Sequence, residues 1–364
     1  MFNGNQRGKR MDISKIDKNF NLNTTTVEDG MRYYTIPHEG FALYGIYYDK
    51  TAQEFTRMDR AFANSVNPGV EALYNFTAGG RLRFATDSTT LAIRVTYPFL
   101  RLMSHMAIAG QGGFSLLEET EVGVKILKIL PPLPHNETGY ELTCPLPGGM
   151  RNYILHFPLY NAVTSLQIGL DESATVGQGR AYRSVKPILY YGSSITQGGC
   201  CSRPDNAYQG LIAKWNNIDF WNYGFSGSAL GEPQMADFFA GFDCSLFVCD
   251  YDHNAPSVEH LRNTHYAFYE RYRKQRPDTP ILFLTKPDFN GSADHIEREK
   301  IIRTTYRKAR ANGDKNVYFI AGKSYFKEDR ENCMVDGCHP NDLGFYLMAK
   351  KVYKKMIEID EIFR

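Results

Sequence analysis

The segment 186–196, KPILYYGSSIT, decides the fold of the second half of the chain. Residues 188–191 form a short apolar and aromatic run that predicts a buried strand. The sequence Gly192-Ser193-Ser194 follows directly and predicts a tight turn at the end of that strand. This strand and turn begin a longer series of strands and helices.

Strand and helix patterns alternate from Lys186 to the C-terminus. Further strands are expected at 219–223, 244–249, 281–285 and 316–320, and helices at 207–215, 234–240, 257–276, 294–312 and 343–362. Ser257 is a plausible N-cap for its helix. A series of this kind predicts an α/β fold, in which a parallel sheet lies between helices.

The first half of the chain has a different pattern. Apolar and polar residues alternate with a period of two at 91–97, 122–126 and 153–157, which is typical of half-buried strands. Glycine and proline pairs separate these runs as turns. We therefore expect an all-β sandwich or jelly-roll domain at 1–180 and an α/β domain at 181–364.

Composition limits the classes of function. The chain has 364 residues, which suggests about two domains. A net charge of +2 argues against a nucleic-acid partner. No apolar run is long enough for a transmembrane helix, so no membrane partner is expected. The first 30 residues lack the apolar region of a secretory signal, and the cysteine count of seven is odd, so we expect reduced thiols and a cytoplasmic location.

Ligands of an open parallel sheet bind beyond the carboxyl ends of its strands. The chemically useful residues that follow the expected strands are Ser193, Ser194, Gly227, His253, Asn254, Asp336 and His339. A serine, small glycines, an amide and an Asp/His pair at one edge of a sheet indicate nucleophilic acyl transfer.

Each of these residues has an expected role. Ser194 is the nucleophile, His339 accepts its proton, and Asp336 orients His339 and stabilises its imidazolium. The N–H groups of Ser194 and Gly227 and the side-chain amide of Asn254 are the candidate oxyanion-hole donors. Glycine at 227 suits this role because a backbone without Cβ allows close approach of substrate.

The two remaining residues, Ser193 and His253, are candidate substrate contacts. The alternative for His253 is a structural role, in which it only stabilises its own loop.

These residues resemble the four sequence blocks of the SGNH (GDSL-type) hydrolase superfamily. The blocks are Gly192-Ser-Ser-Ile-Thr196, Asn222-Tyr-Gly-Phe-Ser-Gly227, Asp252-His-Asn254 and Asp336-Gly-Cys-His339, and the match covers about residues 186–364. Two positions depart from the family pattern. Ser193 stands where the family usually has an Asp before the nucleophile. The third block reads Asp252-His-Asn254, where the family commonly has Gly-x-Asn-Asp. The resemblance implies a flavodoxin-like parallel sheet and a serine esterase without a cofactor.

The first half carries a second resemblance. Gly40-Phe-Ala-Leu-Tyr44 and Phe55-Thr-Arg-Met58 are similar to signatures of a β-sandwich domain that precedes SGNH domains in gut-type bacterial hydrolases. This resemblance implies a carbohydrate O-acetylesterase that acts on acetylated oligosaccharides derived from mannan or xylan. A homo-oligomer is compatible with the sequence. The alternatives are a short-chain lipid or lysophospholipid esterase and a catalytically silent glycan-binding protein.

Other interpretations of single residues are weaker. Ser226 also follows a strand, but it lacks the flanking glycine of a Gly-x-Ser-x-Gly elbow. Asp250 and Asp252 could complete a triad, but they follow the wrong strand. Grouping Cys333, Cys338 and His339 with Cys200 and Cys201 as a metal site does not match a usual zinc spacing, so no metal is expected.

Overall fold

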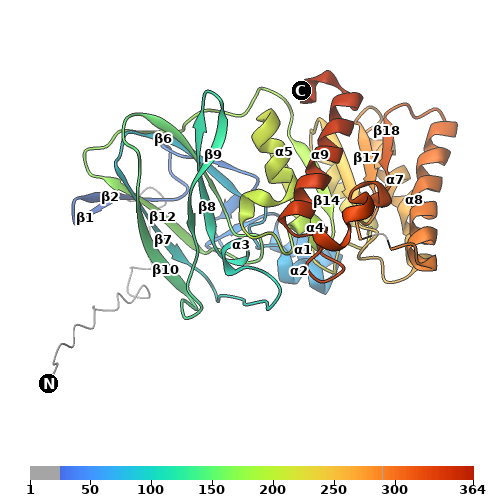
Figure 1. Ribbon diagram of the computed structural model, residues 1–364, viewed down its shortest axis with the longest axis horizontal. Helices are drawn as coiled ribbons and strands as arrows, with labels where there is room; N and C mark the ends of the chain where they lie inside the picture. The colour runs from blue at the N-terminus through green and yellow to red at the C-terminus, as the bar shows by residue number, and fades with distance from the viewer. Residues whose placement is uncertain (1–24, 289) are drawn as a thin grey trace.

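The computed structural model describes residues 25–288 and 290–364. Its N-terminal part contains two antiparallel sheets that face each other (Figure 1). The first has the order β1 (Thr25–Glu28), β2 (Met31–Thr35), β12 (Ser165–Asp171), β7 (Thr90–Thr96) and β10 (Gly139–Pro145). The second has the order β13 (Val176–Gly177), β6 (Arg81–Thr86), β11 (Arg151–His156), β8 (Phe114–Thr120) and β9 (Gly123–Leu130), with β3 (Ala42–Tyr44) also paired to β6. A small hairpin joins β4 (Tyr47–Asp49) to β5 (Glu54–Thr56).

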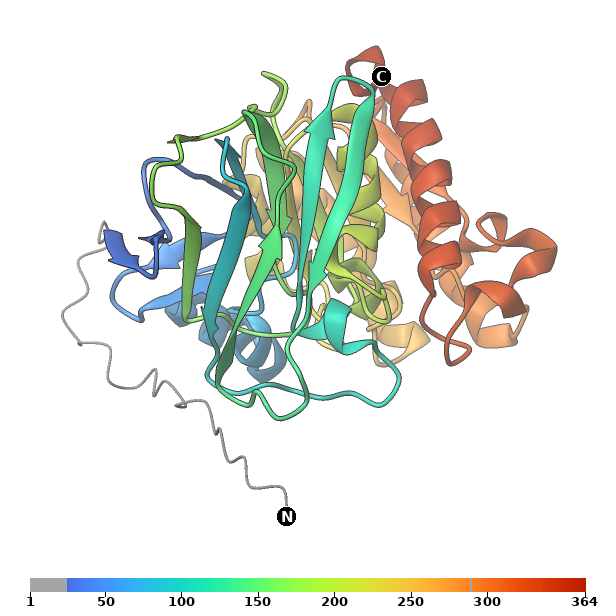
Figure 2. The same cartoon turned by 60° about the vertical axis from the view of Figure 1, so that its left-hand side comes forward.

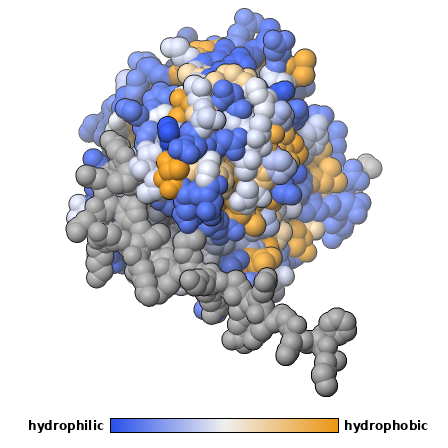
Figure 3. Space-filling model, turned by 90° about the vertical axis from the view of Figure 1, so that its left-hand side faces the viewer, coloured by the Kyte–Doolittle hydropathy of each residue, from blue (hydrophilic) through white to orange (hydrophobic). Residues whose placement is uncertain are grey.

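The predicted β-rich N-terminal half is thus confirmed, and its core lies between the two sheets. Leu91, Ile93 and Val95 of β7 are buried there, as the alternation in sequence requires. Strand β9 pairs only with β8 and is mostly exposed, so the alternation at 122–126 marks an edge strand and not a core strand. The visible outer end of the sandwich is largely hydrophilic, with hydrophobic residues in small groups (Figure 3).

The C-terminal part has the predicted parallel sheet flanked by helices. Its order is β15 (Phe220–Gly224), β14 (Ile188–Gly192), β16 (Leu246–Asp250), β17 (Ile281–Leu284) and β18 (Val317–Ile320), and every pair is parallel. Helices α5 (Tyr208–Asn216) and α9 (Asp342–Ile359) cover one face. Helices α6 (Pro233–Ala240), α7 (Val258–Gln275) and α8 (Ala293–Ala311) cover the other.

Side chains from the N-terminal part enter both cores of the parallel sheet. Met58 and Val70, at helices α1 (Arg60–Val66) and α2 (Pro68–Leu73), pack with Tyr191 and Tyr223 of the sheet. On the other face, Tyr160 and Met106, which lies just before helix α3 (Ile108–Gln111), pack with residues of β14 and α5. Figure 2 shows α1 and α2 beneath the sandwich on the side of the parallel sheet. The packing therefore crosses the domain boundary that we predict after residue 180.

Three buried arginines hold this junction together. Arg57 donates to the carbonyl oxygens of Asn222 (3.0 Å), Gly224 (2.6 Å) and Leu73 (2.6 Å). Arg81 pairs with Asp219, and Arg83, which pairs with Glu119 of its own sheet, also donates to Asn217 Oδ1 at 3.0 Å. Because buried cations need partners, these contacts fix the sandwich against edge strand β15.

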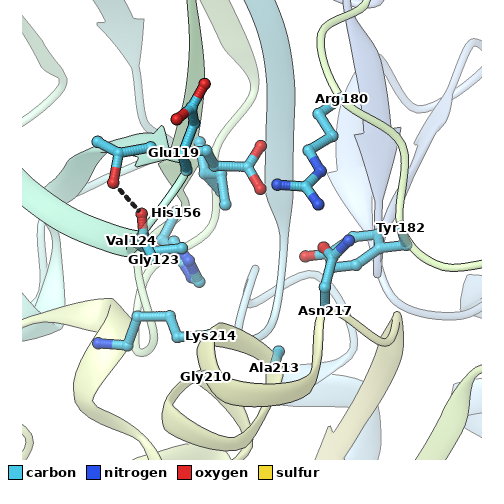
Figure 4. Close-up of a pocket in the computed structure, with 13 residues that line it drawn as sticks. Glu119, Gly123, Val124, His156, Arg180, Tyr182, Gly210, Ala213, Lys214 and Asn217 are labelled. Carbon is cyan, nitrogen blue, oxygen red and sulfur yellow. Dashed lines mark hydrogen bonds between the residues drawn. The ribbon is translucent and has the colours of Figure 1, made fainter.

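A cavity of about 120 Å³ lies at the same junction, between the β8–β9 hairpin and α5 (Figure 4). Arg180 and Tyr182 lie on one side of it, and Gly210 and Lys214 of α5 lie below. None of Ser194, Asp336 and His339 lines it. It is therefore separate from the site described next.

All seven cysteines are free thiols. Among the described residues, no helix is both long enough and apolar enough to cross a membrane.

Candidate active site

Ser194 lies at the C-terminal end of β14, the second strand from the edge of the sheet. It is the first residue of the short helix α4 (Ser194–Gln197), whose N-cap is Ser193. The hydroxyl of Ser193 accepts from the backbone N–H of Ile195 at 3.2 Å. Gly198 ends the helix with φ +103°, a conformation that favours glycine. The strand, the cap and the glycine together fix where the Ser194 hydroxyl points.

Ser194, His339 and Asp336 form a connected hydrogen-bond chain. Ser194 Oγ lies 2.9 Å from His339 Nε2, and His339 Nδ1 lies 2.8 Å from Asp336 Oδ2. The other carboxylate oxygen of Asp336 accepts from the backbone N–H groups of Cys338 (3.0 Å) and His339 (2.7 Å). This is the geometry that a serine nucleophile, its base and an orienting carboxylate require.

The electrostatics of the chain suit those roles. Burial raises the pKa of Asp336, but the hydrogen bonds from His339 and Cys338 outweigh burial and hold it at about 2. Burial lowers the pKa of His339, and its contacts with Cys338 and Asp336 outweigh that effect, so its pKa lies above the usual value. Asp336 is therefore a carboxylate that stabilises the imidazolium form of His339.

Two backbone N–H groups near Ser194 are available to bind an oxyanion. Neither the N–H of Ser194 nor that of Gly227 has an acceptor among the described residues. Gly227 has φ +68°, and a Cβ there would meet no atom within 4 Å, so open space lies beside it. Asn254 donates one amide hydrogen to Phe225 O at 2.7 Å, which brings its side chain to the Gly227 loop and leaves a second hydrogen for substrate.

The N-terminal part adds residues to the site that sequence reasoning missed. Tyr160 donates its hydroxyl hydrogen to Ser194 O at 3.0 Å, and the ring of His105 lies 5.8 Å from that of His339. At Gly199, a Cβ would lie 2.9 Å from Tyr160 Oη and 3.2 Å from His339 Cδ2. The first half of the sequence offered no signal for these contacts, because they depend on how the two parts dock.

Gln197 is a further missed residue, and it positions the Gly227 loop. Its side chain is completely buried. It accepts from the N–H of Ser226 at 2.9 Å and donates to Leu159 O at 3.1 Å. It thereby links the nucleophile helix to the loop that carries Gly227 and to the segment next to Tyr160.

The weaker candidates have other partners. Asp250 accepts from Thr196 Oγ1 at 3.0 Å, and Asp252 accepts from the backbone N–H of Lys286 at 3.1 Å. Burial and the neighbouring Asp252 raise the pKa of Asp250 well above its usual value. No contact joins Asp250, Asp252 or Ser226 to His339 among the described residues.

His253 lies beside the triad, in contact with Cys338 and Asp288. Its Nε2 is 3.4 Å from Cys338 Sγ and 3.4 Å from Asp288 Oδ1. Burial opposes charge on both His253 and Cys338. Contacts with Asp288 and Cys338 outweigh burial and raise the pKa of His253, whereas contacts with His253 and His339 outweigh burial and lower the pKa of Cys338. The described residues contain two groups whose potential metal-ligand atoms lie close together. The first group is His253, Asp288 and Cys338, and the second is His105, Cys200, Asp336 and His339. Cys201 and Cys333 belong to neither group within the described part of the chain.

Two family models match the chain. Residues 185–358 match the GDSL-like lipase/acylhydrolase family. Residues 31–176 match the family that forms the N-terminus of SGNH hydrolase-type esterases and bears the name GxDLY. Segment 40–44 of this chain, GFALY, follows that pattern except at its third position. The comparison with curated proteins gave no match.

Solved structures resemble the whole described architecture. A GDSL-like lipase from Bacteroides ovatus is 26% identical with a TM-score of 0.81, over 90% of this chain and 98% of that chain. A salicylyl-acyltransferase from a tetracycline biosynthetic pathway is 18% identical with a TM-score of 0.74, over 92% and 98%. An acetyl xylan esterase from the rumen bacterium Butyrivibrio proteoclasticus is 13% identical with a TM-score of 0.61, over 92% and 100%. The last two likenesses show a shared fold.

The parallel sheet and its Ser-His-Asp chain define an α/β serine hydrolase. The two family matches assign residues 185–358 to the GDSL-like lipase/acylhydrolase family and residues 31–176 to the family that forms the N-terminus of SGNH hydrolase-type esterases. The recognition made from its sequence blocks is confirmed.

Proposed function

We propose that this protein is a serine esterase that removes O-acetyl groups from carbohydrates. The observation that carries the proposal is the chain Ser194–His339–Asp336 next to two unpaired N–H groups. A nucleophile, its base and oxyanion donors are the parts that ester hydrolysis requires.

Each chemical step of ester hydrolysis can be assigned to named residues. Ser194 Oγ attacks the ester carbonyl carbon while His339 Nε2 takes the hydroxyl proton. The oxyanion accepts hydrogen bonds from the N–H groups of Ser194 and Gly227 and from the amide of Asn254. His339 then gives its proton to the departing sugar oxygen, which leaves an acyl-Ser194. Water loses a proton to His339 and attacks the acyl carbon, and His339 returns that proton to Ser194 Oγ as acetic acid leaves.

The surroundings of Ser194 support a small acyl group. Ser194 is only 7% exposed, and both the Tyr160 hydroxyl and the Gly199 N–H donate to its carbonyl oxygen, at 3.0 and 2.8 Å. Polar groups also lie near the triad: His105 is exposed with its ring 5.8 Å from that of His339, and Asn254 contacts the Gly227 loop, which suits an alcohol rich in hydroxyl groups. The shared fold with an acetyl xylan esterase is compatible with this substrate class.

The direct test is acetate release from acetylated mannan and xylan oligosaccharides by wild type, Ser194→Ala and Ser226→Ala. We expect Ser194→Ala to lose at least about 10³-fold in kcat because no other nucleophile is positioned. Ser226→Ala is the matched control, and it should retain most activity because Ser226 has no histidine partner. A folded Ser194→Ala enzyme with wild-type turnover would refute the proposal.

A p-nitrophenyl ester series from acetate to octanoate separates the alternatives. We expect kcat/KM to fall as the acyl chain grows. A preference for long chains together with inert acetylated sugars would assign the protein to lipid esters. Glycan binding without turnover of any ester would indicate a silent binding protein.

We also propose a cytoplasmic location, where the substrate would be an oligosaccharide already taken into the cell. The seven free thiols support it, because reducing compartments keep cysteines unpaired. Fractionation of the native cells tests this location.

A further inference from the structure

Three loops at the carboxyl edge of the parallel sheet bring His253, Asp288 and Cys338 together. His253 follows β16, Asp288 follows β17, and Cys338 precedes α9. One ligand atom from each residue lies within 4.8 Å of the other two. Ser194, His339 and Asp336 are not among these residues, but Cys338 is the chain neighbour of His339 and also contacts its side chain.

The geometry is not that of a second catalytic triad. In a Cys-His-Asp triad the thiol and the carboxylate contact different nitrogens of the imidazole. Here Cys338 Sγ and Asp288 Oδ1 both lie 3.4 Å from the same atom, His253 Nε2. One N–H cannot point at both atoms, so the three groups converge on a shared point.

The spacing of the three atoms fits a tetrahedral cation. With bonds of about 2.3 Å to sulfur and about 2.0–2.2 Å to nitrogen and oxygen, neighbouring ligands of Zn²⁺ lie about 3.4–3.6 Å apart. Both measured separations are 3.4 Å. The set of thiolate, imidazole and carboxylate is also one that Zn²⁺ uses.

Asp288 supplies an independent observation. Its Oδ1 atom is buried and has no hydrogen-bond partner, and the residue is only 6% exposed. A buried carboxylate oxygen without a donor is costly. Its other oxygen, Oδ2, faces Lys286 Nζ at 3.8 Å and His295 Nε2 at 3.9 Å, so these two nitrogen atoms approach Asp288 on that oxygen. The oxygen without a hydrogen bond is thus the one that faces His253 Nε2 at an ion-pair distance of 3.4 Å.

We propose that His253 Nε2, Asp288 Oδ1 and Cys338 Sγ bind a thiophilic divalent cation of the Zn²⁺ type. On binding, the Cys338 thiol and Nε2 of the His253 imidazolium release their protons to solvent, and the sulfur and the nitrogen bond to the cation with no change of oxidation state. The fourth position is open to water. The cation ties the loop that carries Asn254 to the loop that carries His339.

The other group of potential ligands is a weaker site for a cation. Asp336 and His339 already bond to each other, and His339 bonds to Ser194. A cation there would have to displace these hydrogen bonds, and Cys200 would be its thiol ligand. Comparison of the two cysteines therefore tells the sites apart.

The test uses Co²⁺ as a spectroscopic probe on the full chain, freed of metal by a chelator. Wild type should bind about one Co²⁺ with a thiolate-to-cobalt charge-transfer band in the near ultraviolet, and Zn²⁺ should displace it. Cys338→Ser should lose the band and weaken binding by at least about tenfold, because a hydroxyl is a poor ligand for these cations. Cys200→Ser is the matched control and should keep both the band and the affinity.

A second variant guards against misfolding of the first. His253→Gln should also bind the cation at least about tenfold more weakly while circular dichroism shows an unchanged fold. A charge-transfer band that survives Cys338→Ser but disappears in Cys200→Ser would overturn the proposal and assign the cation to the triad. The absence of stoichiometric Co²⁺ binding to folded wild type would overturn it as well.

Discussion

One candidate oxyanion donor, the N–H of Gly227, belongs to a residue with an unusual backbone conformation and open surroundings. Gly227 has a positive φ of 68°, and the space beside it is open. The residue therefore combines two needs, a left-handed backbone and close access for substrate. Either requirement alone would favour glycine. To separate the two, the effects of a substitution on stability and on catalysis must be measured independently.

Gly227→Ala should lower kcat/KM for p-nitrophenyl acetate by about 10- to 100-fold, because it displaces one oxyanion donor. The left-handed conformation should cost about 1–2 kcal/mol of stability, since no atom obstructs the new Cβ. Steady-state kinetics and urea unfolding measure the two effects.

Gly313→Ala is the matched control for this prediction. Gly313 also has a positive φ, +91°, and open space, but it follows α8, away from the triad. Its stability loss should be similar and its kcat/KM unchanged. Equal activity losses in both variants would show that Gly227 acts only through folding.

At the scale of elements, helices α7 and α8 pack over one face of the sheet and enclose an uncharged histidine. His265 Nδ1 lies 3.0 Å from Thr305 Oγ1, and its ring packs against Tyr251 and Phe283. Burial lowers the pKa of His265 to about 3. The unfolded chain, with an ordinary histidine pKa of about 6.5, takes up this proton first as the pH falls.

Stability should therefore decrease on acidification between pH 6.5 and 3, by up to about 1.4 kcal/mol per pH unit from His265. From pH 7 to pH 5 this residue should account for about 2 kcal/mol. His265→Gln should be less stable at pH 7 but should lose that much less free energy of unfolding on the change to pH 5. Urea unfolding at the two pH values measures this difference.

The exposed His135 provides the comparison for His265. His135→Gln should show the same pH dependence as wild type. If His265→Gln also keeps the wild-type dependence, the acid sensitivity of the fold has another origin.

The elements themselves could be predicted from sequence, because each has a local cause. The strand at 188–191 and the N-cap of α7 at Ser257 follow from hydrophobic pattern and capping chemistry. Site residues that follow strands could be placed for the same reason, since the topology of a parallel sheet gathers those positions at one edge. The structure accordingly brings Ser194, Asp336 and His339 together.

The contacts that could not be predicted are those between parts of the chain. Tyr160 and His105 reach the site only because the sandwich docks beside it. Asp288, in the loop after β17, has no neighbour in sequence that marks it as a partner of His253. A single sequence shows the hydrophobic alternation of strands and the capping residues of helices. It does not show which distant parts of the chain pack against each other.

At the scale of the whole molecule, Arg57 joins the N-terminal part to the strand that leads into the Gly227 loop. Its guanidinium is completely buried and donates to carbonyl oxygens of Leu73, Asn222 and Gly224. It also lies 4.6 Å from the ring centroid of Phe225. One side chain from the N-terminal half thus satisfies backbone groups on both sides of the junction.

Arg57→Lys should lower the free energy of unfolding by about 2–4 kcal/mol and also reduce kcat/KM for p-nitrophenyl acetate. A lysine has a single donor nitrogen and cannot span the three carbonyl groups, so buried acceptors lose their donors. The activity loss follows because Gly224 leads into the loop that holds Gly227.

Arg262→Lys, on the exposed face of α7, is the matched control and should leave both quantities close to wild type. If Arg57→Lys is destabilised but fully active at a temperature where it is folded, then Arg57 joins the two halves without positioning the oxyanion loop. If neither quantity changes, the junction is held by apolar packing alone.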